Sequence, residues 1–298
     1  MNVVDHLLLA GLRNLNRWRF ALKLRRHGRL AYLESARQEG PSLVFLHGLG
    51  ASKDQWGPAV YQLARKHHCL FIDLPGHGQS TCTALQGLGP QAMLAEVESL
   101  LDRLSARPVV LIGSSLGGCL AALYAAMKPE RVERLVLLAP AGLGEAALGP
   151  VFQASLRDGQ DGSFGYRTVE EMQRFWRLLF VRPPQVAGRL ACALAASGRA
   201  RYATLQKVVA DTRHEGLDVL VGQLPSIACR TLVIWGRDDQ VFSIAVLAPL
   251  LRALPNASSH VIEGTGHVPY LERGGEVVAA ITRFMGGPCA LEAGRCSK

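Results

Sequence analysis

A single serine stands at a tight turn between an apolar strand and a helix, and this turn is the strongest constraint on the fold. Residues 111–118 read Leu-Ile-Gly-Ser-Ser-Leu-Gly-Gly, which puts Ser115 between Gly113 and Gly117. An apolar run leads into the turn, and an Ala- and Leu-rich helical run leads out of it. So sharp a turn strains the backbone at the serine and leaves room only for glycine on either side. The serine hydroxyl then stands above the sheet edge, beside the helix N-terminus.

The serine needs a base and an orienting carboxylate, because a serine hydroxyl is a poor nucleophile at neutral pH. Without these partners the motif would be an ordinary strand–helix turn. Of the nine histidines, two follow the downstream pair Asp238 and Asp239. His260 lies inside a predicted strand, whereas His267 lies just past its C-terminal end, where open α/β sheets form ligand crevices. The sequence therefore predicts that His267 is the base and that His260 is structural.

Five segments resemble, in chain order, motifs of the α/β-hydrolase family: His47-Gly-Leu-Gly50, Asp73-Leu-Pro-Gly-His-Gly78, Gly113-Ser-Ser-Leu-Gly-Gly118, Trp235-Gly-Arg-Asp-Asp239 and Gly264-Thr-Gly-His267. The resemblance implies a triad in the order Ser, Asp, His. In the family's Trp-Gly-x-x-Asp pattern the acid lies three residues after the glycine, which selects Asp239. Asp238 is then a loop or capping carboxylate. The position one strand earlier, which some members use, holds no carboxylate here.

Two backbone N–H groups are expected to bind the oxyanion that forms during acyl transfer. One belongs to Leu116, directly after the serine, and the other, by its position after His-Gly, to Leu49. His47 precedes the acid and resembles the structural histidine of family His-Gly motifs, so it is not expected to be the base. Asp73 and His77 are expected to shape a turn without taking part in the chemistry.

The chain as a whole predicts an α/β protein. Its 49% hydrophobic and 19% charged residues are typical of a well-buried globular protein. Strands rich in Val, Ile and Leu alternate with helical runs, which indicates a mostly parallel sheet with helices on both faces. With the resemblance, this predicts an α/β-hydrolase fold with core halves at residues 21–140 and 227–285 and a disordered tail at 286–298.

Residues 141–226 are expected to form an inserted helical cap, because about 90 residues between two strands far exceed one crossover helix. A run over residues 169–180 has large apolar side chains at helical spacing, some of which should line an acyl pocket: Met172, Phe175, Trp176, Leu179 and Phe180. Two prolines at 183–184 end this helix, and further helices are expected from about 185 to 215.

Residues 1–20 predict an amphipathic basic helix, followed by a hairpin of residues 21–26 and 29–35 around a His27-Gly28 turn. The net charge is +9, and seven Lys or Arg residues without an acid lie between Arg13 and Arg29. Such a helix can lie on an anionic membrane surface; the alternative is a helix packed on the core with a solvated charged side. Nucleic-acid binding is not expected, because the basic residues lack interleaved aromatics.

The composition also bounds cofactors and location. Seven cysteines are scattered, without Cys-x-x-Cys spacing, so neither zinc nor a disulfide framework is expected. This predicts reduced thiols and a cytoplasmic location, with peripheral membrane contact as an extension. No stretch reaches the length of a transmembrane helix, and no phosphate-binding glycine motif follows a strand. No cofactor is expected.

Three segments narrow the resemblance to bacterial lipases and esterases close to the monoacylglycerol lipases: residues 46–56, Thr168-Val-Glu-Glu-Met172 and Leu179-Phe-Val-Arg-Pro-Pro184. This implies a serine hydrolase that cleaves carboxylic esters with an acyl chain, monoacylglycerols among them. Carbon–carbon hydrolases of aromatic ring-cleavage products share the triad and remain an alternative, although the segment after His267 lacks the tryptophan they often carry. A non-catalytic hydrolase-fold receptor is disfavoured because the serine and histidine are present. An acyltransferase has the same sequence signature.

Overall fold

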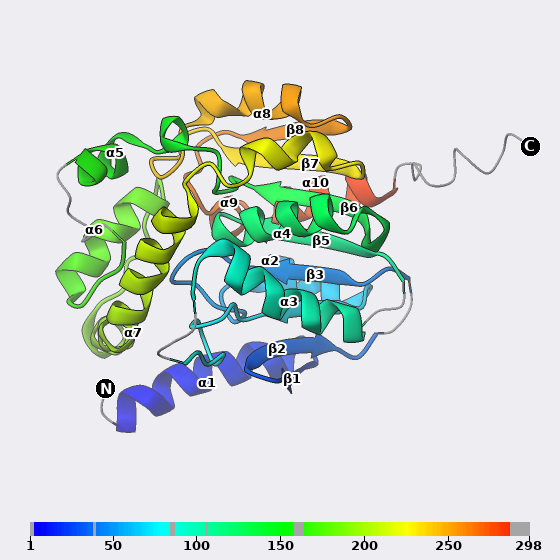
Figure 1. Ribbon diagram of the computed structural model, residues 1–298. Helices are drawn as coiled ribbons and strands as arrows, with labels where there is room; N and C mark the ends of the chain where they lie inside the picture. The colour runs from blue at the N-terminus through cyan, green and yellow to red at the C-terminus, as the bar shows by residue number, and fades with distance from the viewer. Residues whose placement is uncertain (1–2, 38–39, 84–86, 105–106, 158–163, 287–298) are drawn as a thin grey trace, which may run out of the picture.

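An eight-stranded sheet forms the centre of the protein (Figure 1). The structure, a computed structural model, describes residues 3–37, 40–83, 87–104, 107–157 and 164–286. The strand order across the sheet is β1-β2-β4-β3-β5-β6-β7-β8. The strands are β1 (Leu22–His27), β2 (Leu30–Ser35), β3 (Leu43–Leu46), β4 (Cys69–Ile72), β5 (Val109–Ser114), β6 (Val132–Leu138), β7 (Arg230–Gly236) and β8 (Ala257–Ile262).

The sheet is mostly parallel, as predicted. Strand β2 pairs antiparallel with both β1 and β4, and every pair from β4 through to β8 is parallel. The central strands are buried on both faces, so their side chains alternate between two separate apolar cores. In β3, Val44 packs into one core and Phe45 into the other. Strands covered on both sides need continuous apolar runs, which this chain has.

Helices cover both faces of the sheet (Figure 1). The first core is closed by α3 (Pro90–Leu104), α4 (Leu116–Met127) and α8 (Leu247–Ala253). The second is closed by α2 (Gly57–Tyr61), α9 (Pro269–Glu272) and α10 (Gly274–Gly286). The segment between β6 and β7 carries α5 (Pro150–Arg157), α6 (Val169–Leu179) and α7 (Gly188–Glu215), which lie together at one end of the sheet. The N-terminal helix α1 (Val3–Arg19) packs against α7.

The hairpin turns at a different place than the sequence predicts. The hairpin turns at Gly28-Arg29 rather than His27-Gly28, because His27 still pairs with Leu30 and Gly28 takes a left-handed conformation with φ +53°. After β3, helix α2 begins only at Gly57, because the backbone N–H of Lys53 donates to the Asp73 carboxylate instead of entering a helix.

The helices predicted from about residue 185 to 215 are a single helix, α7. Its alanine-rich sequence favours uninterrupted helix, and Gly198 in its middle lies against the Tyr166 ring, where a Cβ would collide. Of the predicted tail, Gly286 ends α10 and residues 287–298 lie outside the described residues. None of the described helices combines the length and apolar character needed to cross a membrane.

A buried lysine ties the loops after β3 and β4 together. Lys53 is fully buried, and its ammonium donates to Asp73 at 2.8 Å, Asp54 at 2.9 Å and Gln79 at 2.9 Å. Asp73 is also fully buried and accepts the backbone N–H groups of Lys53 and Gln79. Arg17 of α1 joins the same cluster through Asp54 and Gln79. Each ammonium proton therefore has an acceptor, which offsets the cost of burying the charge.

Replacement of Lys53 by methionine should lower the free energy of unfolding by about 3–5 kcal/mol, because it leaves the Asp73 charge buried and uncompensated. Urea denaturation of the variant and of the parent protein measures this difference. The matched control is Lys207→Met, which removes a half-buried i,i+4 pair with Asp211 and should cost no more than about 0.5 kcal/mol. Equal losses in the two variants would contradict the assignment of Lys53.

Candidate active site

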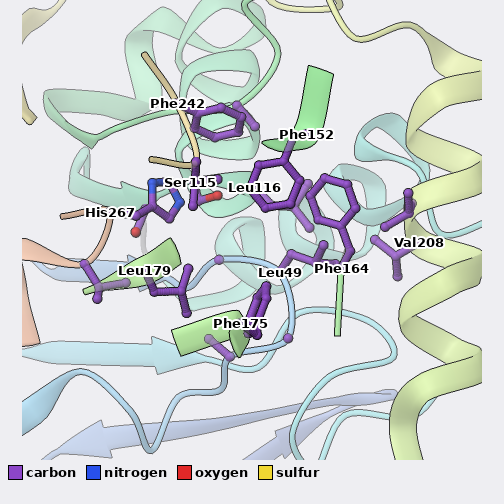
Figure 2. Close-up of a pocket in the computed structure, with 18 of the residues that line it drawn as sticks. Leu49, Ser115, Leu116, Phe152, Phe164, Phe175, Leu179, Val208, Phe242 and His267 are labelled. Atoms are coloured by element: carbon purple, nitrogen blue, oxygen red, sulfur yellow. The ribbon is translucent and has the colours of Figure 1, made fainter. Parts of the chain in front are cut away.

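An apolar cavity of about 440 Å³ lies at the end of the sheet that α5, α6 and α7 cover (Figure 2). Ser115, Leu116, Leu49 and His267, four of the residues singled out from the sequence, line it. They come from the loops that follow β3, β5 and β8, whose carboxyl ends meet at this edge because the strands are parallel.

Ser115 occupies the sharp turn that its glycine neighbours predict. It joins β5 to α4 with φ +53° and ψ −118°, a conformation that is strained for any residue with a side chain. A Cβ at Gly113 would collide with the carbonyl of Gly117, and a Cβ at Gly117 with the carbonyl of Leu46. Glycine at these two positions therefore lets β5, α4 and the end of β3 approach closely enough to expose the serine.

His267 and Asp239 are joined by a hydrogen bond of 2.8 Å between Nδ1 and Oδ2. The other carboxylate oxygen of Asp239 accepts the backbone N–H groups of Val241 at 2.8 Å and Phe242 at 3.0 Å. An acceptor at Nδ1 puts the ring proton there and leaves Nε2 with a lone pair. The Phe242 ring meets the imidazole edge-on, with centroids 5.2 Å apart, and fixes the plane of the ring. Figure 2 shows His267 and Ser115 at the same end of the cavity.

The two predicted oxyanion donors also lie at this end of the cavity. Leu116 is the first residue of α4, so its N–H has no acceptor within the helix. Leu49 follows Gly48, and a Cβ on Gly48 would lie 3.0 Å from the Ser115 Cβ. The loop after β3 thus passes directly beside the serine, and both Leu49 and Leu116 line the cavity there.

Asp238 and His260, which the sequence does not assign to the triad, lie away from the cavity. Asp238 is exposed, and its backbone N–H donates to the Thr265 carbonyl at 3.0 Å. His260 lies on β8 and contacts Glu276 at 3.2 Å on the protein surface. Neither side chain is among the described residues that line the cavity.

His47 and His77 are buried beneath the loop after β3, with ring centroids 5.3 Å apart. Burial lowers the pKa of His47 to about 4, and burial with the neighbouring His47 lowers the pKa of His77 to about 3. His47 contacts the Gly48 carbonyl through Nδ1 and accepts the Leu74 N–H through Nε2. Both rings are therefore neutral at pH 7 and hold backbone in place.

The cavity wall contains both expected and unexpected side chains. Of the predicted stripe on α6, Phe175, Trp176, Leu179 and Phe180 line the cavity, whereas Met172 is fully buried away from it. Sequence reasoning missed further lining residues from separate segments, among them Phe152, Phe164, Val208 and Phe242. Within the described residues no cluster of His, Cys, Asp and Glu could hold a metal ion.

Comparison with known proteins places the chain in a family. The family model described as alpha/beta hydrolase fold matches residues 41–274. The chain belongs to this family. Mouse monoacylglycerol lipase ABHD6 is 30% identical to this hydrolase over 261 residues, which cover 82% of this chain and 75% of the mouse protein. These findings support a hydrolase that resembles the monoacylglycerol lipases.

Solved structures give the same fold. The crystal structure of a membrane phospholipase A, described as a bacterial virulence factor, is 29% identical with a TM-score of 0.88, and the match covers 95% of this chain and 91% of that chain. A 2-hydroxy-6-oxo-6-phenylhexa-2,4-dienoate hydrolase from Rhodococcus is 20% identical with a TM-score of 0.74, covering 89% and 99% of the two chains. At that identity the second likeness shows the fold alone.

The stability of this hydrolase should fall with acid through its buried histidines. Because the folded-state pKa of His77 lies below the ordinary value of 6.5, the unfolded chain takes up the proton first, and stability is lost as pH falls from about 6.5 toward 3. Each such group contributes a slope of about 1.4 kcal/mol per pH unit within its window. In His77→Gln the slope between pH 4 and 6 should decrease by about one proton, as measured by urea denaturation at each pH. An unchanged slope would show that His77 is charged in the folded protein.

Proposed function

We propose that this hydrolase cleaves carboxylic esters with an acyl chain through Ser115, His267 and Asp239. The observation that carries the proposal is the His267–Asp239 hydrogen bond at the end of an apolar cavity that also holds Ser115. This combination offers a nucleophile, an oriented base and a place for an apolar substrate.

In the proposed reaction, the Ser115 hydroxyl attacks the ester carbonyl while Nε2 of His267 takes its proton. The Leu49 and Leu116 N–H groups hold the resulting oxyanion. Asp239 keeps the imidazole in the required tautomer and stabilises its positive charge. His267 then gives the proton to the leaving alcohol, and water attacks the acyl-enzyme with the same base to release the acid.

The lining and volume of the cavity are consistent with binding of an acyl chain. Its wall is mostly apolar and rich in phenylalanine, leucine and valine side chains, and its volume lies within the usual range of about 300–1,000 Å³ for small-molecule sites. We take residues 141–226 as the cap that closes it. The likeness to mouse monoacylglycerol lipase ABHD6 makes monoacylglycerols the first substrates to test.

The proposal includes peripheral membrane contact through residues 1–20. One face of α1 packs on the protein, where Asp5 pairs with Arg189 of α7 and Arg17 with Asp54. The opposite face is apolar and exposed, and Trp18 at its end is 82% exposed: Val4, Leu7, Leu12, Leu15 and Trp18. An exposed apolar face with a terminal tryptophan and flanking arginines suits an anionic lipid surface. The likeness to a membrane phospholipase A is consistent with this contact.

We also propose a cytoplasmic location. The support for it is the state of the thiols, because five cysteines of the described residues are free: Cys69, Cys82, Cys119, Cys192 and Cys229.

Ser115→Ala should lower kcat for p-nitrophenyl esters by about 10⁴-fold or more, because it removes the nucleophile, and Asp239→Asn should cost about 10⁴-fold through the wrong histidine tautomer. Release of p-nitrophenol from a series of acyl chain lengths measures both. Asp238→Asn is the matched control and should stay within twofold of the parent protein.

The same assay separates the alternatives. Monoacylglycerols and a ring-cleavage dienoate are compared as substrates, and faster turnover of the dienoate would favour the carbon–carbon hydrolase. Acyl transfer to an added alcohol in preference to water would indicate an acyltransferase. Activity retained by Ser115→Ala would overturn the mechanism.

Trp18→Ala should reduce binding to phosphatidylglycerol vesicles by about 10- to 150-fold, since burial of one large side chain in lipid contributes about 1.5–3 kcal/mol. Vesicle co-sedimentation measures the bound fraction. Val221→Ala, a change at an exposed apolar residue far from α1 in sequence, serves as the control. If the parent protein stays in the supernatant, the contact does not exist.

A further inference from the structure

The backbone of the loop that carries His267 is hydrogen-bonded to two neighbouring segments. On one side the Thr265 carbonyl accepts the N–H of Asp238 at 3.0 Å. On the other side the N–H of His267 donates to the carbonyl of Leu179, the last residue of α6, at 2.8 Å. A Cβ at Gly266 would collide with that same Leu179 carbonyl, so the loop and the end of α6 are in direct backbone contact. The position of His267 is thereby tied to the position of α6.

Glu272 joins the same two segments a second time. It is the last residue of α9, and its Oε2 accepts the N–H of Gly266 at 2.6 Å. Its Oε1 accepts the N–H groups of Val181 at 2.9 Å and Arg182 at 3.3 Å, directly after α6. One carboxylate oxygen therefore accepts a hydrogen bond from the histidine loop, and the other accepts hydrogen bonds from the segment that follows α6. Hydrogen bonds to an ionised acceptor are about twice as strong as neutral ones, which suits Glu272 to hold two segments together.

The segment that Glu272 holds is also a wall of the cavity. Leu179 and Phe180 line the cavity, and the backbone between Leu179 and Arg182 makes the contacts to His267 and Glu272. A substrate that fills the cavity would contact Leu179 and Phe180, and these belong to the segment that is hydrogen-bonded to the His267 backbone. Displacement of a catalytic group by about 1 Å can lower a rate by about 100-fold, so this connection bears on the reaction.

We propose that Glu272 is a positioning residue that couples the end of α6 to His267, so that the base is in place only when this wall of the cavity is in place. Glu272 is not among the described residues that line the cavity, and it acts through the backbone of residues 266–267. The kinetic part of this inference rests on the proposed function, whereas the structural coupling does not.

Glu272→Gln separates the two sides of the link, because an amide has one acceptor oxygen and can serve only one of them. Hydrogen exchange at residue resolution should become about 10-fold faster at the His267 amide, although its acceptor is Leu179 and not Glu272. Glu272→Asp, which keeps the charge but is one methylene shorter, should act in the same direction. Glu276→Gln is the matched control, since it removes a charge from α10 at the His260 contact and should leave this amide unchanged.

The kinetic readout is turnover per active site, titrated with a serine-directed phosphonate so that misfolded protein does not count. Glu272→Gln should lower kcat for p-nitrophenyl esters about 10-fold with KM within twofold, because the base is displaced while the side chains that line the cavity are unchanged. Unchanged exchange at His267, or unchanged kcat per titrated site, would overturn the proposal. If the parent protein has no esterase activity, the proposed function fails, and the exchange measurement alone decides the coupling.

Discussion

The site depends on backbone segments that approach one another more closely than any side chain allows. Gly117 lies against the carbonyl of Leu46, Gly236 against that of Gly266, and Gly266 against that of Leu179. Each approach joins a different pair of neighbours: the serine turn with the end of β3, the aspartate loop with the histidine loop, and the histidine loop with α6. Backbone segments packed this tightly can be arranged in few other ways. The main chain therefore sets the geometry of the site and the positions of its side chains.

Near the cavity, a buried side chain is charged only where hydrogen-bond partners compensate its charge. The Lys53 ammonium and the Asp73 carboxylate are fully buried, and each has several hydrogen-bond partners close to the loop that carries Leu49. His47 and His77, packed in the same region, stay neutral because burial lowers the pKa of each ring. The loop beside Ser115 is therefore supported by one compensated ion cluster and two uncharged rings, which add little net charge next to the place where the proposed reaction would form an oxyanion.

Local motifs were predictable from sequence and long-range contacts were not. The turn at Ser115 could be predicted because the need for glycine is a property of a few consecutive residues. Ser115 and His267 line one cavity and Asp239 is hydrogen-bonded to His267, and their catalytic roles stay predictions for the assays above. The cavity wall came only partly from the α6 pattern, because Phe152 and Val208 reach it from segments far apart in the chain. Glu272 resembles any glutamate at a helix end, and only the three backbone N–H groups around it reveal what it holds.

The packing of α1 on α7 has a consequence for synthesis on the ribosome. Helix α1 rests on a helix that is completed only at Glu215, long after α1 itself has been synthesised. Until then α1 has no α7 to cover it, and the face that it later turns to the protein is as open as the face with Trp18. Sequence-distant contacts form late because loop closure must precede them. While α7 is still unmade, the nascent chain therefore leaves both faces of this amphipathic segment open to chaperones or to a lipid surface.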